Sequence, residues 1–267
     1  MTQNQIMNEL DRHYQEALKR YKESQIVAIC LQGSQNYGLD IEGSDIDTKC
    51  ILTPTFKDIA MANQMVSTTH VLDNNEHLDA KDIRAYISCF RKQNLNFLEI
   101  LFTEYFIIPV QYYDQWNRLV ANREDIARMN EFRAVKSMKG IALEKYHAME
   151  HPYPSKVDIL AKYGYDSKQL HHLVRVDEYL TRYIAGEQYK DCLIPKGDMR
   201  EYLLDIKKGK YDLAAARSIA DKTLAHVTQI ADEFCAERED KEDEDMRELL
   251  QDVQYEIMKI AVKEELK

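Results

Sequence analysis

The sequence contains few of the residues that break helices and form tight turns. Only 8 glycines and 5 prolines occur among 267 residues, about 5% of the chain, whereas average usage is about 12%. This shortage excludes collagen-like and low-complexity chains and argues against a sandwich of many short strands. Since 31% of the residues are charged and long stretches lack glycine and proline, the composition favours helices.

Long hydrophobic runs and paired cysteines are also missing. No stretch approaches the roughly 18 apolar residues of a membrane span, so no membrane association is expected. The opening residues MTQNQIMNEL lack the basic and then apolar regions of a signal peptide. The five cysteines are far apart and form no CxxC pair, which is typical of reduced thiols. We therefore expect a cytoplasmic protein without a disulfide framework or a zinc site.

Charge is unevenly distributed along the chain. The net charge of −10 argues against broad, non-specific coating of nucleic acid. Residues 237–248 hold eight acids and three bases and are interpreted as a solvated segment between helices. Residues 133–175 hold eight bases, four acids and four histidines. The middle of an acidic chain is thus locally basic, which leaves room for a local anionic ligand.

Hydrophobic periodicity divides the sequence near Pro109. Before it, alternating and short apolar segments predict strands between helices. The strands are expected at 25–31, 44–52, 67–72 and 76–80, and the helices at 3–22, 82–92 and 97–102.

Beyond Pro109 the periodicity is helical throughout. Helices are expected at 111–122, 124–150, 166–186, 197–208, 212–238 and 243–264. We therefore predict an α+β fold. Residues 1–108 would form a catalytic domain with a small mixed sheet, and residues 109–267 an all-helical domain.

The stretch GSQNYG, followed closely by GSDID, has the clearest chemical pattern. Asp45 and Asp47 lie two residues apart on a predicted strand, so both side chains leave the same face. Two carboxylates at one place repel each other unless a cation joins them, and oxygen ligands suit Mg²⁺, which commonly also coordinates phosphates. Upstream, Gly33 lets the backbone approach a phosphate, and the Ser34 hydroxyl and free N–H groups of the turn can donate to it. A phosphate turn and a carboxylate pair are the parts needed for two-metal nucleotidyl transfer.

This combination resembles the DNA polymerase β-like nucleotidyltransferase superfamily, whose hallmark is a GS followed about ten residues later by Asp-x-Asp on a strand. With NFLEILF and KQLHHLVR further along, the pattern is similar to a bacterial and phage branch that includes RNA-ligase-associated members. The resemblance covers roughly residues 25–210 and implies a third catalytic carboxylate on a later antiparallel strand. Asp79 matches best, since it shares a strand face with His77. Asp82 is the alternative, although its place before a helix suits an N-cap better.

A second candidate set lies in the helical half. Lys168, His172 and Arg175 are spaced i, i+4 and i+7, which places them on one helix face. The resemblance implies that the helical domain closes over the nucleotide and that such basic residues meet its triphosphate. The alternative is an ordinary basic face, with His172 beside a carboxylate. Lys136 and Lys139 are weaker candidates in the same basic stretch.

Two further residues belong to the pattern shared with that branch. Tyr37, which precedes Gly38, either contacts the nucleotide or packs a helix onto the sheet. Glu99, within NFLEILF, has no assigned chemistry and is interpreted as structural.

The expected function is transfer of a nucleoside monophosphate from an NTP, such as ATP, to an acceptor hydroxyl. Asp45 and Asp47 would hold two Mg²⁺ ions, or Mn²⁺, and Asp79 would complete the site. The resemblance favours an RNA end, in RNA repair, as the acceptor. A protein hydroxyl, which would make the chain an AMP-transferring enzyme, a small molecule or another nucleotide remain alternatives.

Two other classes of function are also compatible with the sequence. One is a nucleotide-binding or antitoxin-like module that keeps the fold without turnover. The other is a helical interaction scaffold, because the helices expected in residues 212–264 offer a surface for a homodimer.

Overall fold

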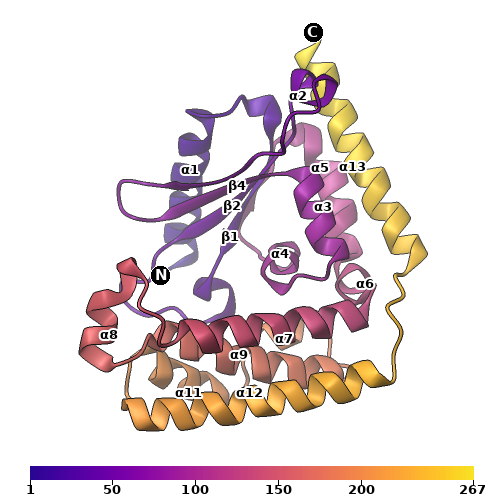
Figure 1. The fold of residues 1–267 in the computed structure, drawn as a ribbon. Helices are drawn as coiled ribbons and strands as arrows, with labels where there is room; N and C mark the ends of the chain where they lie inside the picture. Colours follow the sequence, from indigo (N-terminus) through magenta and orange to yellow (C-terminus); the bar gives the residue numbers. More distant parts are fainter. The chain divides into compact units, whose positions relative to one another are not determined.

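A mixed sheet of five strands organises the N-terminal part of the protein (Figure 1). The computed structural model describes residues 1–267, the side chain of Ser155 excepted. β2 runs antiparallel to β1 and parallel to β4, which confirms the predicted mixed sheet. The strands are β1 (Ile26–Gln32), β2 (Asp47–Leu52), β3 (Ser67–Val71), β4 (His77–Asp82) and β5 (Phe106–Ile107), in the spatial order β3-β4-β2-β1-β5.

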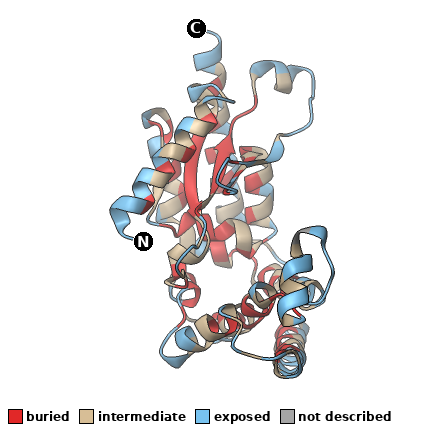
Figure 2. Cartoon of the chain, turned by 90° about the vertical axis from the view of Figure 1, so that its left-hand side faces the viewer, coloured by how far each residue is buried: buried red, intermediate tan, exposed pale blue. Residues whose placement is uncertain are grey.

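Apolar residues explain why β1 and β2 are central strands. β1 is buried from Ile26 to Leu31, and β2 is buried from Thr48 onward. Helix α1 (Gln3–Leu18) packs against one face of the sheet, where its Ala17 joins a cluster with residues of three strands. Figure 2 shows these strands as buried segments between more exposed helices. Since burying one aliphatic side chain stabilises the fold by about 1.5–3 kcal/mol, these runs hold the sheet in the interior.

Helices α3 (Ile83–Arg91) and α4 (Leu95–Leu98) lie on the opposite side of the sheet from α1 (Figure 1). α3 begins after Asp82, whose Oδ1 accepts a hydrogen bond from the Arg84 backbone N–H at 2.8 Å. This is the N-cap role that the sequence suggested for Asp82. On the same side, Lys49 Nζ of β2 lies 4.6 Å from the centre of the Phe97 ring.

The last helix, α13 (Glu244–Glu265), packs against α3 and against α5 (Tyr113–Ala121). An ion pair of 2.7 Å between Arg91 Nε and Glu242 Oε1 fastens the segment that leads into α13. The C-terminal helix therefore belongs with the sheet, although more than a hundred residues of chain separate them.

Contacts divide the chain into two units, which are described separately below. The first unit is Met1–Met129 together with Glu242–Lys267, and the second is Asn130–Lys241. The boundary predicted at Pro109 falls inside the first unit. Hydrophobic periodicity does not reveal this, because it records which face of a helix is buried and not which helix covers it.

The second unit is built from helices alone, as the α+β prediction required. α9 is its central helix and contacts α7, α10, α11 and α12, and it buries Leu170, Leu173 and Leu180 at helical spacing. None of the described helices is long and apolar enough to cross a membrane. The helices are α7 (Glu131–Ala148), α8 (Val157–Tyr163), α9 (Ser167–Ile184), α10 (Tyr189–Leu193), α11 (Asp198–Lys207) and α12 (Leu213–Ala236).

Several local predictions differ from the structure. The single helix predicted over 124–150 is two helices, α6 (Arg123–Arg128) and α7, because the Asn130 side chain accepts a hydrogen bond from the Arg133 N–H at 2.9 Å and starts a new helix. Helices α2 (Phe56–Ala60), α8 and α10 were not predicted. Each is too short to show a clear helical period in the sequence.

Candidate active site

The turn after β1 has the backbone geometry expected of a phosphate-binding loop. Gly33 has φ +112°, a conformation that residues with a Cβ rarely adopt. A short 3-10 helix, Ser34–Tyr37, follows, and the chain leaves it through Gly38 at φ +65°. Glycine is therefore favoured at both ends of the turn, which explains the two glycines of GSQNYG.

Tyr37 is buried beneath this turn. Its ring is 4% exposed, and its hydroxyl donates a hydrogen bond to Glu99 Oε2. Glu99 itself is buried in the short 3-10 helix that follows α4. Of the two roles considered for Tyr37, this geometry supports packing, and it agrees with the structural interpretation of Glu99.

The pairing of β1 with β2 brings the turn beside Asp45 and Asp47. Gln32, the last residue of β1, lies opposite Asp47 in the antiparallel ladder. Across this junction, the Gln35 side chain donates from Nε2 to the backbone carbonyl of Asp45 at 2.7 Å. The structure thus joins the GSQNYG turn and the GSDID segment, which the sequence only suggested by their short separation.

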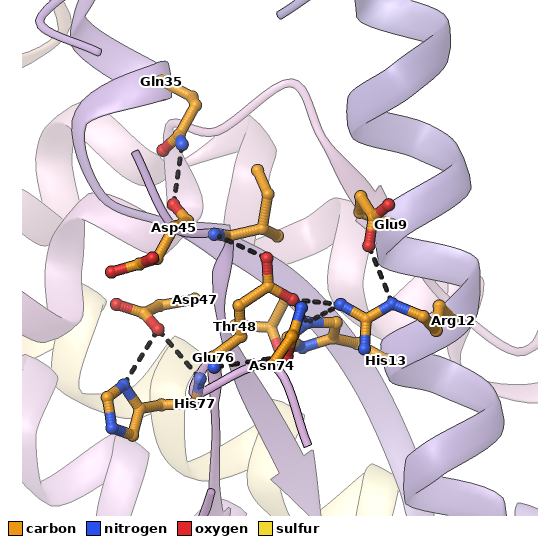
Figure 3. Close-up of polar contacts among 11 residues, drawn as sticks. Glu9, Arg12, His13, Gln35, Asp45, Asp47, Thr48, Asn74, Glu76 and His77 are labelled. Carbon is orange, nitrogen blue, oxygen red and sulfur yellow. Dashed lines mark hydrogen bonds and ion pairs between the residues drawn. The ribbon is translucent and has the colours of Figure 1, made fainter. Parts of the chain in front are cut away.

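Asp45 and Asp47 extend to the same side of their segment (Figure 3). Asp45 is exposed, Asp47 is half-buried, and Ile46 between them is 1% exposed. Within the described part of the chain, the Asp45 carboxylate takes part in no hydrogen bond or ion pair, so its oxygens are available to a cation. The donor set consists of carboxylate oxygens beside a turn of backbone N–H groups, and this set fits Mg²⁺.

His77 is a contact of this site that the sequence did not identify. Its backbone N–H donates to Asp47 Oδ1 at 2.9 Å, and its Nδ1 lies 3.0 Å from the same oxygen (Figure 3). His77 precedes Leu78, which pairs with Thr48 in the parallel ladder, so it stands beside Asp47. The sequence predicted that His77 and Asp79 share one strand face. Which residue of β2 lies beside His77 depends, however, on how β4 aligns with β2.

Asp79 lies one step further along β4, opposite Lys49. Its Oδ1 accepts from Lys81 Nζ at 2.9 Å and from Thr69 Oγ1 at 3.1 Å, and its Oδ2 is 3.5 Å from Lys49 Nζ. Burial raises the pKa of Asp79, but its hydrogen bonds and the charges of Lys81 and Lys49 outweigh burial and hold that pKa below its ordinary value. This carboxylate is the counter-ion of two lysines.

In this structure the three candidate carboxylates are not gathered into one metal-binding group, and the role of Asp79 as third ligand stays a prediction. Among the residues that the structure describes, no three His, Cys, Asp or Glu side chains are arranged to hold a metal ion. β4, which carries Asp79, is antiparallel to β3 but parallel to the strand of Asp47. The alternative, Asp82, is 1% exposed and is engaged by Arg84 as the N-cap of α3. The structure brings Asp45 and Asp47 together and leaves the third position open.

Lys168, His172 and Arg175 lie on α9, as predicted, and belong to the second unit. Lys168 is exposed near the start of the helix, whereas His172 and Arg175 are half-buried. Burial, together with the neighbouring His171 and Arg175, holds the pKa of His172 well below its ordinary value. Its ring is therefore neutral at pH 7 and brings no positive charge to a phosphate. Contact of these residues with a nucleotide stays a prediction.

The mixed sheet, the turn after β1 and the aspartates at the start of β2 together define a nucleotidyltransferase fold of the DNA polymerase β type. The model of the RNA repair pathway DNA polymerase beta family, RlaP, matches residues 3–181. The chain belongs to this family.

A solved structure of a nucleotidyltransferase-like protein from Exiguobacterium sibiricum 255-15 is similar over 85% of this chain and 75% of that chain, with 9% sequence identity and a TM-score of 0.29. No curated protein matches the sequence.

Proposed function

We propose that this protein is a Mg²⁺-dependent enzyme that transfers a nucleoside monophosphate from an NTP to a hydroxyl at an RNA end. One observation carries the proposal: the Asp45 carboxylate, without a protein partner among the described residues, lies beside that of Asp47, while the Asp45 backbone carbonyl accepts a hydrogen bond from Gln35 of the turn after Gly33. Membership of an RNA repair family supports RNA as the acceptor.

The residues of the first unit divide the work between phosphate and metal. The Ser34 hydroxyl and the N–H groups of the turn donate to the phosphates of the NTP. Asp45 and Asp47 hold Mg²⁺, or Mn²⁺ in its place, and two ions are expected as in related chemistry. When bound, the metal supplies positive charge that offsets the charge of the triphosphate and of the leaving group.

The reaction requires positioning more than acid–base chemistry. The acceptor oxygen attacks the α-phosphorus, the bond from that phosphorus to the bridging oxygen of the β-phosphate breaks, and pyrophosphate and a proton leave. Gln35 joins the turn that would hold the triphosphate to the backbone of Asp45. This hydrogen bond would align the triphosphate with the carboxylates. Lys168 and Arg175, from the helical unit, would add positive charge at the phosphates.

The charge distribution agrees with recognition of an end and not of a long stretch of RNA. The chain carries a net charge of −10, whereas residues 133–175 hold eight bases against four acids. Because non-specific affinity grows with the number of phosphates contacted, an acidic protein with one basic region is suited to a short segment. We therefore expect only a shallow dependence of RNA affinity on salt concentration.

A direct test uses the four α-³²P-labelled NTPs with Mg²⁺ and three acceptors: RNA with a free 3′-hydroxyl, the same RNA after periodate oxidation, and total protein extract. The proposal predicts label on the first RNA only, released pyrophosphate, and no label with Asp45→Asn. Label on protein would make the chain an AMP-transferring enzyme. Label on no acceptor, with folded protein, would overturn the proposal.

A second candidate function is nucleotide binding without turnover. It is favoured by the capture of Asp79 by Lys49 and Lys81, which leaves a pair of carboxylates where the family pattern implies three. This alternative predicts that NTP and Mg²⁺ raise the melting temperature while no acceptor is labelled. The same assay thus separates the two functions.

A further inference from the structure

Ile46, which separates the two candidate metal ligands, donates its backbone N–H to a side chain. The acceptor is Glu76 Oε1 at 3.1 Å (Figure 3). The ladder between β2 and β4 starts only at Thr48 and Leu78, so Ile46 lies before the point where strand pairing would satisfy it. A carboxylate thus takes the place of a strand partner at the residue between Asp45 and Asp47.

Glu76 is itself held firmly. It is 8% exposed, and its Oε2 receives the guanidinium of Arg12 and lies 3.0 Å from His13 Nε2. Asn74 Oδ1 accepts the Glu76 backbone N–H at 3.3 Å. Burial disfavours a charged carboxylate, but these hydrogen bonds and the charge of Arg12 more than compensate and lower the pKa of Glu76. The carboxylate is therefore ionised and fixed in place.

The anchor continues into α1 and β2. His13 is 0% exposed, and its Nδ1 lies 2.8 Å from Thr48 Oγ1. Thr48 directly follows Asp47, so α1 reaches the carboxylate segment by two routes: through Glu76 to Ile46, and through His13 to Thr48. Neither route uses an oxygen of Asp45 or Asp47. The Asp45 carboxylate stays available on the other side of the segment, and the contacts of the Asp47 carboxylate with His77 are made through Oδ1.

We propose that Glu76, anchored by Arg12 and His13, is a positioning residue that fixes Asp45 and Asp47 for metal binding. This inference rests on the proposed function, because it assumes that the pair holds the metal. The physical reason is that two neighbouring carboxylates repel each other, and the segment that carries them lies at the end of a ladder. A hydrogen bond to the N–H between them restrains both backbone positions at once.

The test compares Glu76→Ala and Glu76→Gln with the parent protein by three measurements: amide hydrogen exchange of the 44–48 segment, Mn²⁺ affinity by electron paramagnetic resonance, and kcat and KM for nucleotide transfer. Loss of contacts that orient metal ligands commonly costs about 10- to 100-fold in metal affinity or activity. We expect a loss of this size in Mn²⁺ affinity for Glu76→Ala, faster exchange at Ile46, and a lower kcat at an unchanged KM for RNA. Glu76→Gln retains an acceptor oxygen and should recover part of the exchange protection.

One control variant and one further test variant separate a positioning role of Glu76 from a general effect on stability. Tyr112→Phe removes a partly buried hydrogen bond from the Tyr112 hydroxyl to the Ser24 carbonyl elsewhere in the same unit and should leave Mn²⁺ affinity unchanged. Arg12→Ala removes the partly exposed anchor of Glu76 and should shift exchange and affinity in the same direction as Glu76→Ala. It decides the question if Glu76→Ala does not fold.

The outcomes also separate this inference from the proposed function. Unchanged exchange and Mn²⁺ affinity in both Glu76→Ala and Arg12→Ala, or in Arg12→Ala alone if Glu76→Ala does not fold, would overturn the positioning role, even if the parent enzyme is active. Weakened Mn²⁺ binding in these variants, with a parent that labels no acceptor, would support the positioning role and overturn the transferase.

Discussion

Lys49 and Asp79 face each other across the parallel ladder between β2 and β4, with Lys49 Nζ 3.5 Å from Asp79 Oδ2. The lysine is 4% exposed, and burial lowers its pKa even though Asp79 and Glu99 act in the opposite direction. A buried ammonium of this kind needs its counter-ion, because removal of one partner leaves an uncompensated charge in a medium of low polarity.

Asp79→Asn should therefore destabilise the protein. We expect a loss of about 3 kcal/mol in the free energy of unfolding, the lower end of the range for a broken buried pair, since the Asp79 side chain is still 17% exposed. Urea unfolding measures this loss. The matched double variant Lys49→Met/Asp79→Leu should regain much of it, because it also removes the buried charge of Lys49. Lys81 loses its partner in this variant, but its side chain is 20% exposed and can be hydrated.

Asp79→Asn also tests whether Asp79 is the third catalytic carboxylate. If Asp79 serves only as a counter-ion, the folded fraction of Asp79→Asn retains nucleotide transfer. If it is also a catalytic residue, as the family resemblance implies, transfer is lost even at temperatures where the variant is fully folded. Stability within about 0.5 kcal/mol of the parent would contradict the counter-ion role.

Asp45→Asn and Asp47→Asn should both abolish transfer but differ in stability without metal. The Asp45 carboxylate has no partner in the described chain, so its neutralisation removes repulsion and should leave the melting temperature equal or higher. Asp47 accepts the His77 N–H, and its substitution should cost about 1 kcal/mol for the weakened hydrogen bond. Thermal melts without ligand test this difference.

Adding Mg²⁺ and NTP to the same melts tests the metal assignment. A ligand present at 100 times its Kd stabilises the folded state by about 2.7 kcal/mol, and both variants should lose this gain. A variant that keeps both ligand-induced stabilisation and turnover would show that the metal is bound elsewhere.

Lys168→Ala tests the contribution of the helical unit to phosphate binding. A charge-assisted hydrogen bond contributes about 1.5–3 kcal/mol, so its loss should weaken nucleotide affinity by roughly 10- to 150-fold. An exposed basic face predicts at most about 1 kcal/mol. Calorimetry with a non-hydrolysable NTP and Mg²⁺ separates the two, with Lys222→Ala on the exposed side of α12 as control. An affinity within about twofold of the parent would mean that Lys168 does not reach the nucleotide.

His171 makes the stability of the helical unit depend on pH. Burial lowers the pKa of this histidine to about 4, and its Nδ1 lies 2.9 Å from the Leu203 carbonyl. Since the unfolded chain takes up the proton first, with a pKa near 6.5, the neutral ring contributes its full stability above that pH. The contribution is lost as the pH falls from about 6.5 to 4, by up to about 1.4 kcal/mol per pH unit.

Urea unfolding of the parent and of His171→Gln at pH 7.5, 6 and 5 measures this effect. The parent should lose stability more steeply than the variant over that interval. Equal slopes in the two proteins would show that His171 is not the group responsible, and the neighbouring His172, whose pKa is also lowered by burial, would be the next to substitute.

The sequence by itself determined the parts of this protein that depend on local pattern. A short apolar run predicted β1, alternation predicted β2, and a turn between two strand-like segments predicted β3 and β4, because each of these patterns is local to its own segment. The short separation of Gly33, which follows β1, from Asp45, which precedes β2, identified the candidate site in the same local way. Asp82 was recognisable as an N-cap from its place before a helix.

Tertiary structure alone decided the relations that join distant segments. Strand alternation fixes which face of β4 Asp79 occupies, but it does not fix how β4 aligns with β2. The observed register places His77 beside Asp47 and Asp79 beside Lys49. The hydrogen bond from Ile46 to Glu76 likewise spans thirty residues, and α13, from the far end of the chain, packs against α3 and α5. Such contacts depend on packing between whole elements, and the periodicity within one element does not show which other element packs against it.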